Sequence, residues 1–163
     1  MLFPANYDEF LERVRRFAQR LEAAKSELEV PDYGWYPYQS LATLDSVAGL
    51  LRDDFDELRD LLVTAPAADV GCADGDYALL LDSLGVETDA VDHQETNFNQ
   101  MRGLSVLKRR FDAATQIFDL DFDTRFELPR TSYGLIVFLG TLYHLKNPFY
   151  ILEMFAMRVL TRQ

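Results

Sequence analysis

The sequence predicts an α/β protein with a mainly parallel sheet and a helical extension in front of it. An apolar run at 67–70 leads through a glycine turn into a stretch of helical character at 77–81. Two further runs of strand length, 86–92 and 114–119, end in an acidic residue. Between them, Asn97 is expected to cap a helix that carries Phe98, Met101, Leu104 and Leu107. Strands that alternate with helices are typical of α/β proteins, in which the sheet is parallel. The first 63 residues instead repeat apolar residues at helical spacing.

The helical extension, residues 1–63, is expected to begin with a capped helix. Asn6 and Glu9 have the spacing of a capping box, and apolar residues follow at helical intervals. A second apolar stripe, from Ser40 to Leu62, predicts one or two more helices with a break near the middle.

Residues 31–38 connect these helices and contain four aromatic residues, two prolines and a glycine. This composition is incompatible with a regular helix. Two interpretations stay open. The segment packs on the core, or it lines a ligand pocket in which aromatic rings attract a positive charge.

The glycine turn and the start of the following helix form the candidate ligand site. A strand, a glycine turn and a helix N-terminus let a ligand approach unpaired backbone N–H groups. A dinucleotide loop would need glycine or alanine at position 76, where the chain has Asp76, and Asp74 lies two residues earlier. Carboxylates that face a pyrophosphate repel it, so a ligand with positive charge is expected in place of NAD or FAD.

The segment Asp69-Val70-Gly71-Cys72-Ala73-Asp74-Gly75 resembles the first motif of the class I SAM-dependent methyltransferases. In that family this loop holds the methionine end of S-adenosylmethionine (SAM), with the acidic residue near the amino group. The resemblance implies a Rossmann-like, doubly wound sheet, SAM as cofactor and S-adenosylhomocysteine as product. It assigns cofactor contacts to Asp69, Gly71, Cys72, Ala73 and Gly75.

Acidic residues at the ends of the second and third strands extend this resemblance. Asp92 lies 17 residues after the glycine loop, where a carboxylate can accept hydrogen bonds from both ribose hydroxyls. The family carries an acid at this place, so the resemblance assigns Asp92 and the adjacent His93 to the cofactor. Asp119 and Leu120 match the family's adenine position, and Asp121 remains an alternative to Asp119.

The apolar run at 133–139 predicts a fourth, buried strand. It leads into Gly140-Thr141-Leu142-Tyr143-His144 and then Pro148, which resembles the fourth motif of a methyltransferase subset. That subset includes enzymes that act on small molecules and some that modify a tRNA wobble uridine. The loop is expected at the carboxyl end of the strands, where open α/β sheets bind ligands.

The resemblance in this loop assigns Leu139 and Gly140 to the cofactor. His144 or Tyr143 is a candidate base or orienting group for methyl transfer. The competing interpretation is that these two side chains only pack against the loop and cap it. Asn147 and Pro148 are expected to start a final helix, with Ile151, Phe155 and Val159 facing inward.

Composition restricts the class of protein and partner. With 27 acidic and 16 basic residues the net charge is −11, which disfavours a nucleic-acid partner. A basic cluster at Arg102 and 108–110 keeps such a partner open, although a solvated helix end explains the cluster better. The chain has two histidines, one cysteine and no run of 18 apolar residues, so neither a metal site nor a membrane span is expected. A cytoplasmic protein with a small-molecule substrate is the resulting expectation.

The resemblance covers roughly Asp69 to Pro148, within a core of residues 64–163 that is expected to form one folding unit with the extension. The family's sheet has seven strands in the order 3-2-1-4-5-7-6, so a C-terminally truncated sheet of strands one to four is expected here. An apolar fourth strand at the edge predicts a homodimer through that edge. The alternative is that the N-terminal helices cover the edge and keep the chain monomeric.

The leading functional hypothesis is a SAM-dependent methyltransferase. A non-catalytic SAM-binding or interaction module is the main alternative, because half of the family's sheet is missing from the pattern. A dinucleotide-binding dehydrogenase fragment is a third, weaker hypothesis. The methyl acceptor is not indicated by any motif.

Overall fold

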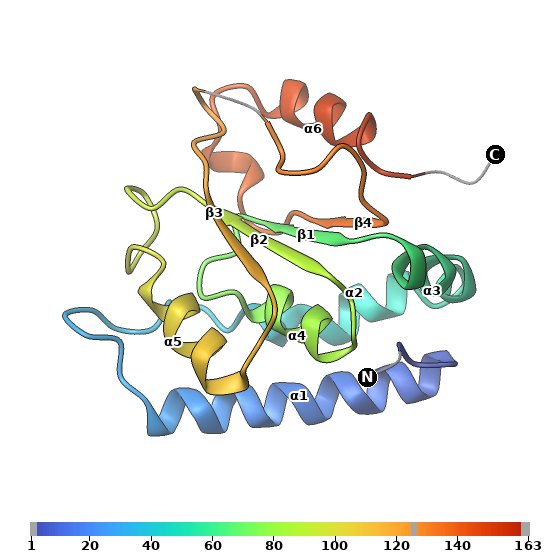
Figure 1. The fold of residues 1–163 in the computed structure, drawn as a ribbon, viewed down its shortest axis with the longest axis horizontal. Coiled ribbons are helices and arrows are strands. Elements are labelled where there is room, and N and C mark those ends of the chain that lie inside the picture. Colours follow the sequence, from blue (N-terminus) through green and yellow to red (C-terminus); the bar gives the residue numbers. More distant parts are fainter. Residues whose placement is uncertain (1–2, 125–126, 161–163) are drawn as a thin grey trace.

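Four parallel strands form the sheet at the centre of the molecule (Figure 1). The computed structural model describes residues 3–124 and 127–160. The strands lie in the order β3-β2-β1-β4, and every pairing is parallel. Their bounds are β1 (Ala67–Val70), β2 (Thr88–Asp92), β3 (Gln116–Asp119) and β4 (Leu135–Val137). The α/β class with a parallel, Rossmann-like sheet is therefore confirmed.

Helices cover both faces of this sheet (Figure 1). On one face lie α4 and α5, and α1 crosses their outer side. On the opposite face lies α6. The helices are α1 (Tyr7–Glu27), α2 (Leu44–Leu50), α3 (Phe55–Thr64), α4 (Asp76–Ser83), α5 (Arg102–Phe111) and α6 (Pro148–Ala156), with 3-10 helices η1 (Ser40–Thr43) and η2 (Leu142–His144).

The N-terminus of α1 is capped as predicted. The Asn6 side chain accepts a hydrogen bond from the Glu9 N–H at 2.9 Å, and the Glu9 carboxylate accepts one from the Ala5 N–H at 3.0 Å. The buried side of α1 is its apolar stripe, which consists of Phe10, Val14, Phe17, Leu21 and Ala24. This stripe packs on α4 and α5, so the extension is joined to the core.

Two predicted details at the helix ends are wrong. Asn97 does not cap a helix, because α5 begins only at Arg102. The Asn97 side-chain oxygen instead accepts the N–H groups of Asn99 and Met101 and closes an irregular turn. Val159 is not an inward residue of the last helix. It lies beyond α6 and forms a parallel bridge with Tyr133.

A buried ion pair fixes the irregular segment that leads into β4. Asp89, on β2, is fully buried and accepts two hydrogen bonds from the Arg130 guanidinium, at 2.8 and 3.0 Å. The Tyr133 hydroxyl donates a third hydrogen bond to the same carboxylate at 2.8 Å. A buried carboxylate needs such partners, so β2 and the segment before β4 are held together.

The outer side of β4 is only partly covered. At its start, Tyr133 donates to the Arg158 carbonyl and accepts from the Leu160 N–H, each at 2.8 Å. Beyond that bridge, none of the described residues pairs with β4 on this side. The predicted edge strand is therefore present, and α3 of the N-terminal extension packs against it without pairing with its backbone.

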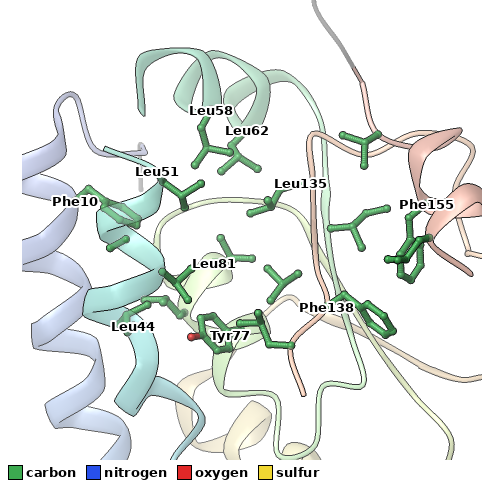
Figure 2. A pocket seen from close by; sticks show the side chains of 18 of the residues that line it. Phe10, Leu44, Leu51, Leu58, Leu62, Tyr77, Leu81, Leu135, Phe138 and Phe155 are labelled. Atoms are coloured by element: carbon green, nitrogen blue, oxygen red, sulfur yellow. The ribbon is translucent and has the colours of Figure 1, made fainter. Parts of the chain in front are cut away.

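An apolar groove of about 420 Å³ runs along this edge (Figure 2). One wall comes from α1 to α4, and the other from β4 and α6. Figure 2 shows Leu58, Leu62 and Leu135 together at one end and Phe138 and Phe155 at the other. The Tyr77 hydroxyl is already hydrogen-bonded to Thr43. The groove lacks the convergent polar groups of a small-molecule site and has the character of an uncovered core.

Self-association through this groove stays a prediction, which a charge on its wall tests. Leu152 is 41% exposed and lines the groove from α6, whereas Val137 also packs into the core. Leu152→Glu should dissociate a dimer, because burying a carboxylate without a partner is costly. Light scattering at micromolar concentration measures this effect. Leu50→Glu, an exposed position outside the groove, is the matched control and should leave the dimer intact. A wild-type monomer of 18.8 kDa would refute the prediction.

Candidate functional site

The glycine turn after β1 is in contact with the loop after β4. Gly71 has a φ of +72°, which favours glycine, and a Cβ there would lie 2.0 Å from the Thr141 hydroxyl oxygen. The first and fourth motifs of the sequence therefore meet at the carboxyl ends of β1 and β4. Thr141 makes this close contact, and its role was not predicted.

The N–H groups of this turn are largely used within the protein. Those of Gly71, Ala73, Gly75 and Ala78 donate to the Val91 carbonyl, the Asp92 carboxylate, the Cys72 carbonyl and the Asp69 carboxylate, at 2.7–3.0 Å. The sequence had suggested unpaired N–H groups that a ligand could meet. In the structure neighbouring acceptors take these donors, whereas the N–H groups of Asp74, Asp76 and Tyr77 have no partner among the described residues.

Asp69, at the third position of β1, caps the next helix. It is 4% exposed, and its carboxylate accepts the Ala78 N–H in the first turn of α4 at 3.0 Å. Burial raises the pKa of Asp69 to about 7, although the hydrogen bond from Ala78 lowers it in part. A buried carboxyl of this kind changes charge near neutral pH and responds to any cation that binds beside it.

Asp76, the first residue of α4, does not face a ligand, and the charge argument from the sequence was wrong for it. Its carboxylate forms an ion pair with Lys25 of α1, at 2.8 and 3.0 Å. Burial raises the pKa of Asp76, and Lys25 opposes that shift. The cation comes from 51 residues earlier in the chain, which is why the spacing around the turn did not reveal it.

Asp74 is likewise used inside the protein. It is 2% exposed and accepts hydrogen bonds from the Asn99 side chain at 2.7 Å and from the Tyr36 N–H at 2.8 Å. Lys25 lies 3.8 Å from the same carboxylate. Asp74 therefore ties the glycine turn to the aromatic segment 31–38 and to the turn before α5. The expectation that it repels a pyrophosphate is replaced by this structural role.

Asp92 ends β2 beside the glycine turn, as predicted. It accepts the Ala73 N–H at 2.8 Å, the Asn97 side-chain amide at 3.0 Å and the His93 N–H at 2.8 Å. Burial raises the pKa of Asp92, while these hydrogen bonds, led by that from Asn97, lower it. A carboxylate has about four acceptor positions, so a ligand hydroxyl either takes the remaining one or displaces a donor.

Asp119 lies next to this residue, and Asp121 does not. Asp119 pairs with Asp92 in the strand register and accepts the Gln94 N–H at 2.9 Å. The His93 ring nitrogen Nδ1 is 3.3 Å from the Asp119 carboxylate. Asp121 instead accepts the Asp123 N–H and the Thr124 hydroxyl and so closes its own turn. Of the two alternatives, the geometry brings Asp119 to the site, and Leu120 follows it with its N–H donating to the Asp92 carbonyl.

The loop after β4 carries the remaining predicted residues. Leu139 is exposed, and Gly140 has a φ of +77° in open space. Tyr143 is 78% exposed, and its ring lies 4.3 Å from that of His144 in η2. Both side chains are exposed, and neither is packed in the core. Their exposure does not support the interpretation that they only pack against the loop and cap it.

Residues from outside the motifs complete the site, and sequence reasoning missed several of them. Lys25, Asn97 and Asn99 each contact a motif residue, and Tyr36 reaches the same region from the aromatic segment. The dense aromatic composition of 31–38 was the one available signal. Trp35 of this segment packs on the core, and pocket lining by its other rings stays a prediction.

The basic cluster is largely occupied within the protein. Arg102 pairs with Asp32 at 3.0 Å, Arg110 with Glu27 at 3.5 Å, and Lys108 donates to the Thr115 carbonyl. These contacts tie α5 to α1 and to β3. They fit the interpretation of the cluster as a helix end with structural partners.

Within residues 3–124 and 127–160, no group of three or more His, Cys, Asp or Glu side chains is arranged to hold a metal ion. Among the helices described, none combines the length and hydrophobicity of a membrane span. The free thiol of Cys72 is buried, which raises its pKa well above the usual value. Cys72 therefore stays a neutral thiol in the turn and lacks the character of a nucleophile.

Comparison with known proteins supports the fold. No protein-family model matches the chain, and no curated protein matches it. Among solved structures, the crystal structure of EvdMO1 is similar, with a TM-score of 0.56 and 17% sequence identity. The similar region covers 87% of this chain and 32% of the EvdMO1 chain, so this chain spans about a third of that protein's length. At this identity the likeness supports the α/β fold alone.

Proposed function

We propose that this chain binds SAM at the carboxyl ends of β1 and β2 and is related to the class I methyltransferases. Its reaction would transfer the methyl group to a small-molecule acceptor and leave S-adenosylhomocysteine. A cytoplasmic location is part of the proposal.

The observation that carries the proposal is the position of Asp92 beside a glycine turn in which most N–H groups of residues 71–75 are already bonded. Such a site offers carboxylate oxygens to hydroxyl and cationic groups. The N–H groups of Gly71, Cys72, Ala73 and Gly75 are not free for a phosphate. SAM has two ribose hydroxyls, an ammonium and a sulfonium, whereas NAD and FAD bring an anionic pyrophosphate. The structure thus supplies a better reason against a dinucleotide than the charges of Asp74 and Asp76.

In this proposal the ligand lies along the ends of three strands. Asp92 accepts from the ribose, with His93 beside it. Asp119 and Leu120 contact the adenine. The methionine end lies near the turn and the β4 loop, which contribute Asp69, Gly71, Cys72, Ala73, Gly75, Leu139 and Gly140.

Methyl transfer at such a site depends on positioning. A lone pair of the acceptor forms the new bond to the methyl carbon as the carbon–sulfur bond breaks, and sulfur becomes neutral. An acceptor that carries a proton must lose it to a base. His144 and Tyr143 stand exposed on the β4 loop and are the candidates for this role.

A non-catalytic SAM-binding or interaction module is the second candidate. The uncovered apolar groove along β4 favours it, because a surface of that kind suits a partner. Calorimetry with SAM, combined with a methyl-transfer assay on candidate acceptors, separates the two. Binding without turnover on any acceptor would favour the module.

Asp92→Ala is expected to weaken SAM binding about tenfold to a hundredfold, because ribose hydroxyls lose their acceptor. Isothermal titration of the variant measures the loss. Its melting temperature without ligand reports any damage to the turn. Asp121→Asn is the matched control, since Asp121 closes its own turn, and its affinity should equal that of the wild type. Tight NAD binding, or unchanged SAM affinity in Asp92→Ala, would contradict the proposal.

The affinity for SAM, a cationic ligand, should also depend on pH through the protonation of Asp69. The folded-state pKa of about 7 is above that of a free carboxyl, so the group is mostly protonated at pH 6 without ligand. A cationic ligand favours the ionised form, and binding below pH 7 must therefore release a proton. SAM affinity is expected to rise about fivefold to tenfold from pH 6 to pH 7.5. Asp69→Asn keeps an acceptor for Ala78 and should flatten this profile, and an equally steep profile in the variant would exclude Asp69 as its cause.

A further inference from the structure

The aromatic segment 31–38 is anchored to the glycine turn through its backbone. The Tyr36 N–H donates to the Asp74 carboxylate at 2.8 Å, and the Gly34 carbonyl accepts from the Asn99 side chain at 3.2 Å. The Trp35 indole N–H donates to the Lys25 carbonyl at 2.9 Å. The consecutive residues Gly34, Trp35 and Tyr36 thus each have a partner in the core or in α1. The position of Tyr36 is set by Asp74, a buried residue of the ligand turn.

The Tyr36 side chain extends from this anchor toward the candidate site. Its ring makes edge-on contacts with Tyr38 and Phe98, at centroid distances of 5.4 and 6.2 Å. Burial raises the pKa of the Tyr36 hydroxyl, and so do the nearby Tyr143, Tyr38, Asp92 and Asp74. The Tyr36 hydroxyl is therefore within electrostatic range of Asp92, at the end of β2, and of Tyr143, on the loop after β4.

The charges around this ring favour a cation. Asp92 and Asp74 lie close enough to act on the Tyr36 hydroxyl, and both are carboxylates. Lys25 is shared between Asp76, at 2.8 Å, and Asp74, at 3.8 Å, whereas Asp92 has no ion pair among the described residues and is the carboxylate left for a cation. An aromatic face in an acidic surrounding attracts a positively charged group.

We propose that Tyr36 closes the site over the positive centre of the ligand, the sulfonium of SAM, with Asp74 as the residue that positions it. This inference rests on the proposed function. It makes the N-terminal extension part of the binding site and makes Tyr36 a determinant of selectivity for charged SAM over neutral S-adenosylhomocysteine. Asp74, although part of the glycine motif, acts through Tyr36 and does not contact the ligand.

Calorimetric titration with SAM and with S-adenosylhomocysteine tests the proposal. Tyr36→Leu should lose about fivefold to thirtyfold in affinity for SAM and less than about twofold for S-adenosylhomocysteine, because the neutral sulfur gains no cation–π attraction. Tyr36→Phe keeps the ring face and should resemble the wild type. Tyr33→Leu, in the same segment but with its ring against the Arg102 guanidinium at 4.9 Å, is the matched control and should change neither affinity.

Asp74→Ala, which removes the acceptor of the Tyr36 N–H, tests the positioning role, because a general loss of structure would weaken both ligands equally. The variant should lose selectivity for SAM in the same direction as Tyr36→Leu. If the wild type binds both ligands and Tyr36→Leu weakens them equally or not at all, the inference falls and the proposed function stands. If the wild type binds neither ligand, both fall. A selective loss in Tyr36→Leu without one in Asp74→Ala would overturn the role of Asp74 alone.

Discussion

The buried carboxylate of Asp74 is the constraint on which the arrangement of the site depends. A carboxylate with 2% exposure must find hydrogen-bond donors inside the protein, and it finds them in Asn99 and in the Tyr36 backbone. The contact leaves no room for a side chain at Gly103 in α5, where a Cβ would lie 2.1 Å from the Asp74 oxygen. One side chain of the glycine turn thereby fixes the aromatic segment and the start of α5 together.

The adjacent pair of Asp76 and Lys25 adds α1 to this assembly. A buried carboxylate and a largely buried ammonium stabilise each other only while both are present, so α1 is held against the first turn of α4. Buried polar contacts consequently join the extension, 1–63, to the core, 64–163. A ligand at the carboxyl ends of the strands would lie where the two parts meet, and the extension would contribute to its binding.

Local patterns in the sequence predicted most of the fold and the position of some residues around the candidate site. The α1 cap, the four strands and the positions of Gly71 and Asp92 follow from residue spacing, because each depends on neighbours in the chain. The partners of Asp74 and Asp76 could not be predicted, since Lys25 and Tyr36 are brought there by the packing of α1. The turn at Asn97 was mistaken for a helix start because an Asx turn and a helix cap use the same side chain in the same way. Asp74 and Asp76, near the glycine turn, were interpreted as facing a ligand. In the structure both are buried and bond to other parts of the protein.

A crystal structure with S-adenosylhomocysteine tests most directly whether the site lies at the junction that Asp74 organises. The account predicts ligand density at the carboxyl ends of β1 and β2, with the ribose at Asp92, the adenine beside Asp119 and the thioether below the Tyr36 ring. It also predicts that Asp74 keeps its bonds to Tyr36 and Asn99 when the ligand is bound. Density in the apolar groove along β4, or a ligand at the turn with Tyr36 displaced and Asp74 in contact with it, would contradict the account.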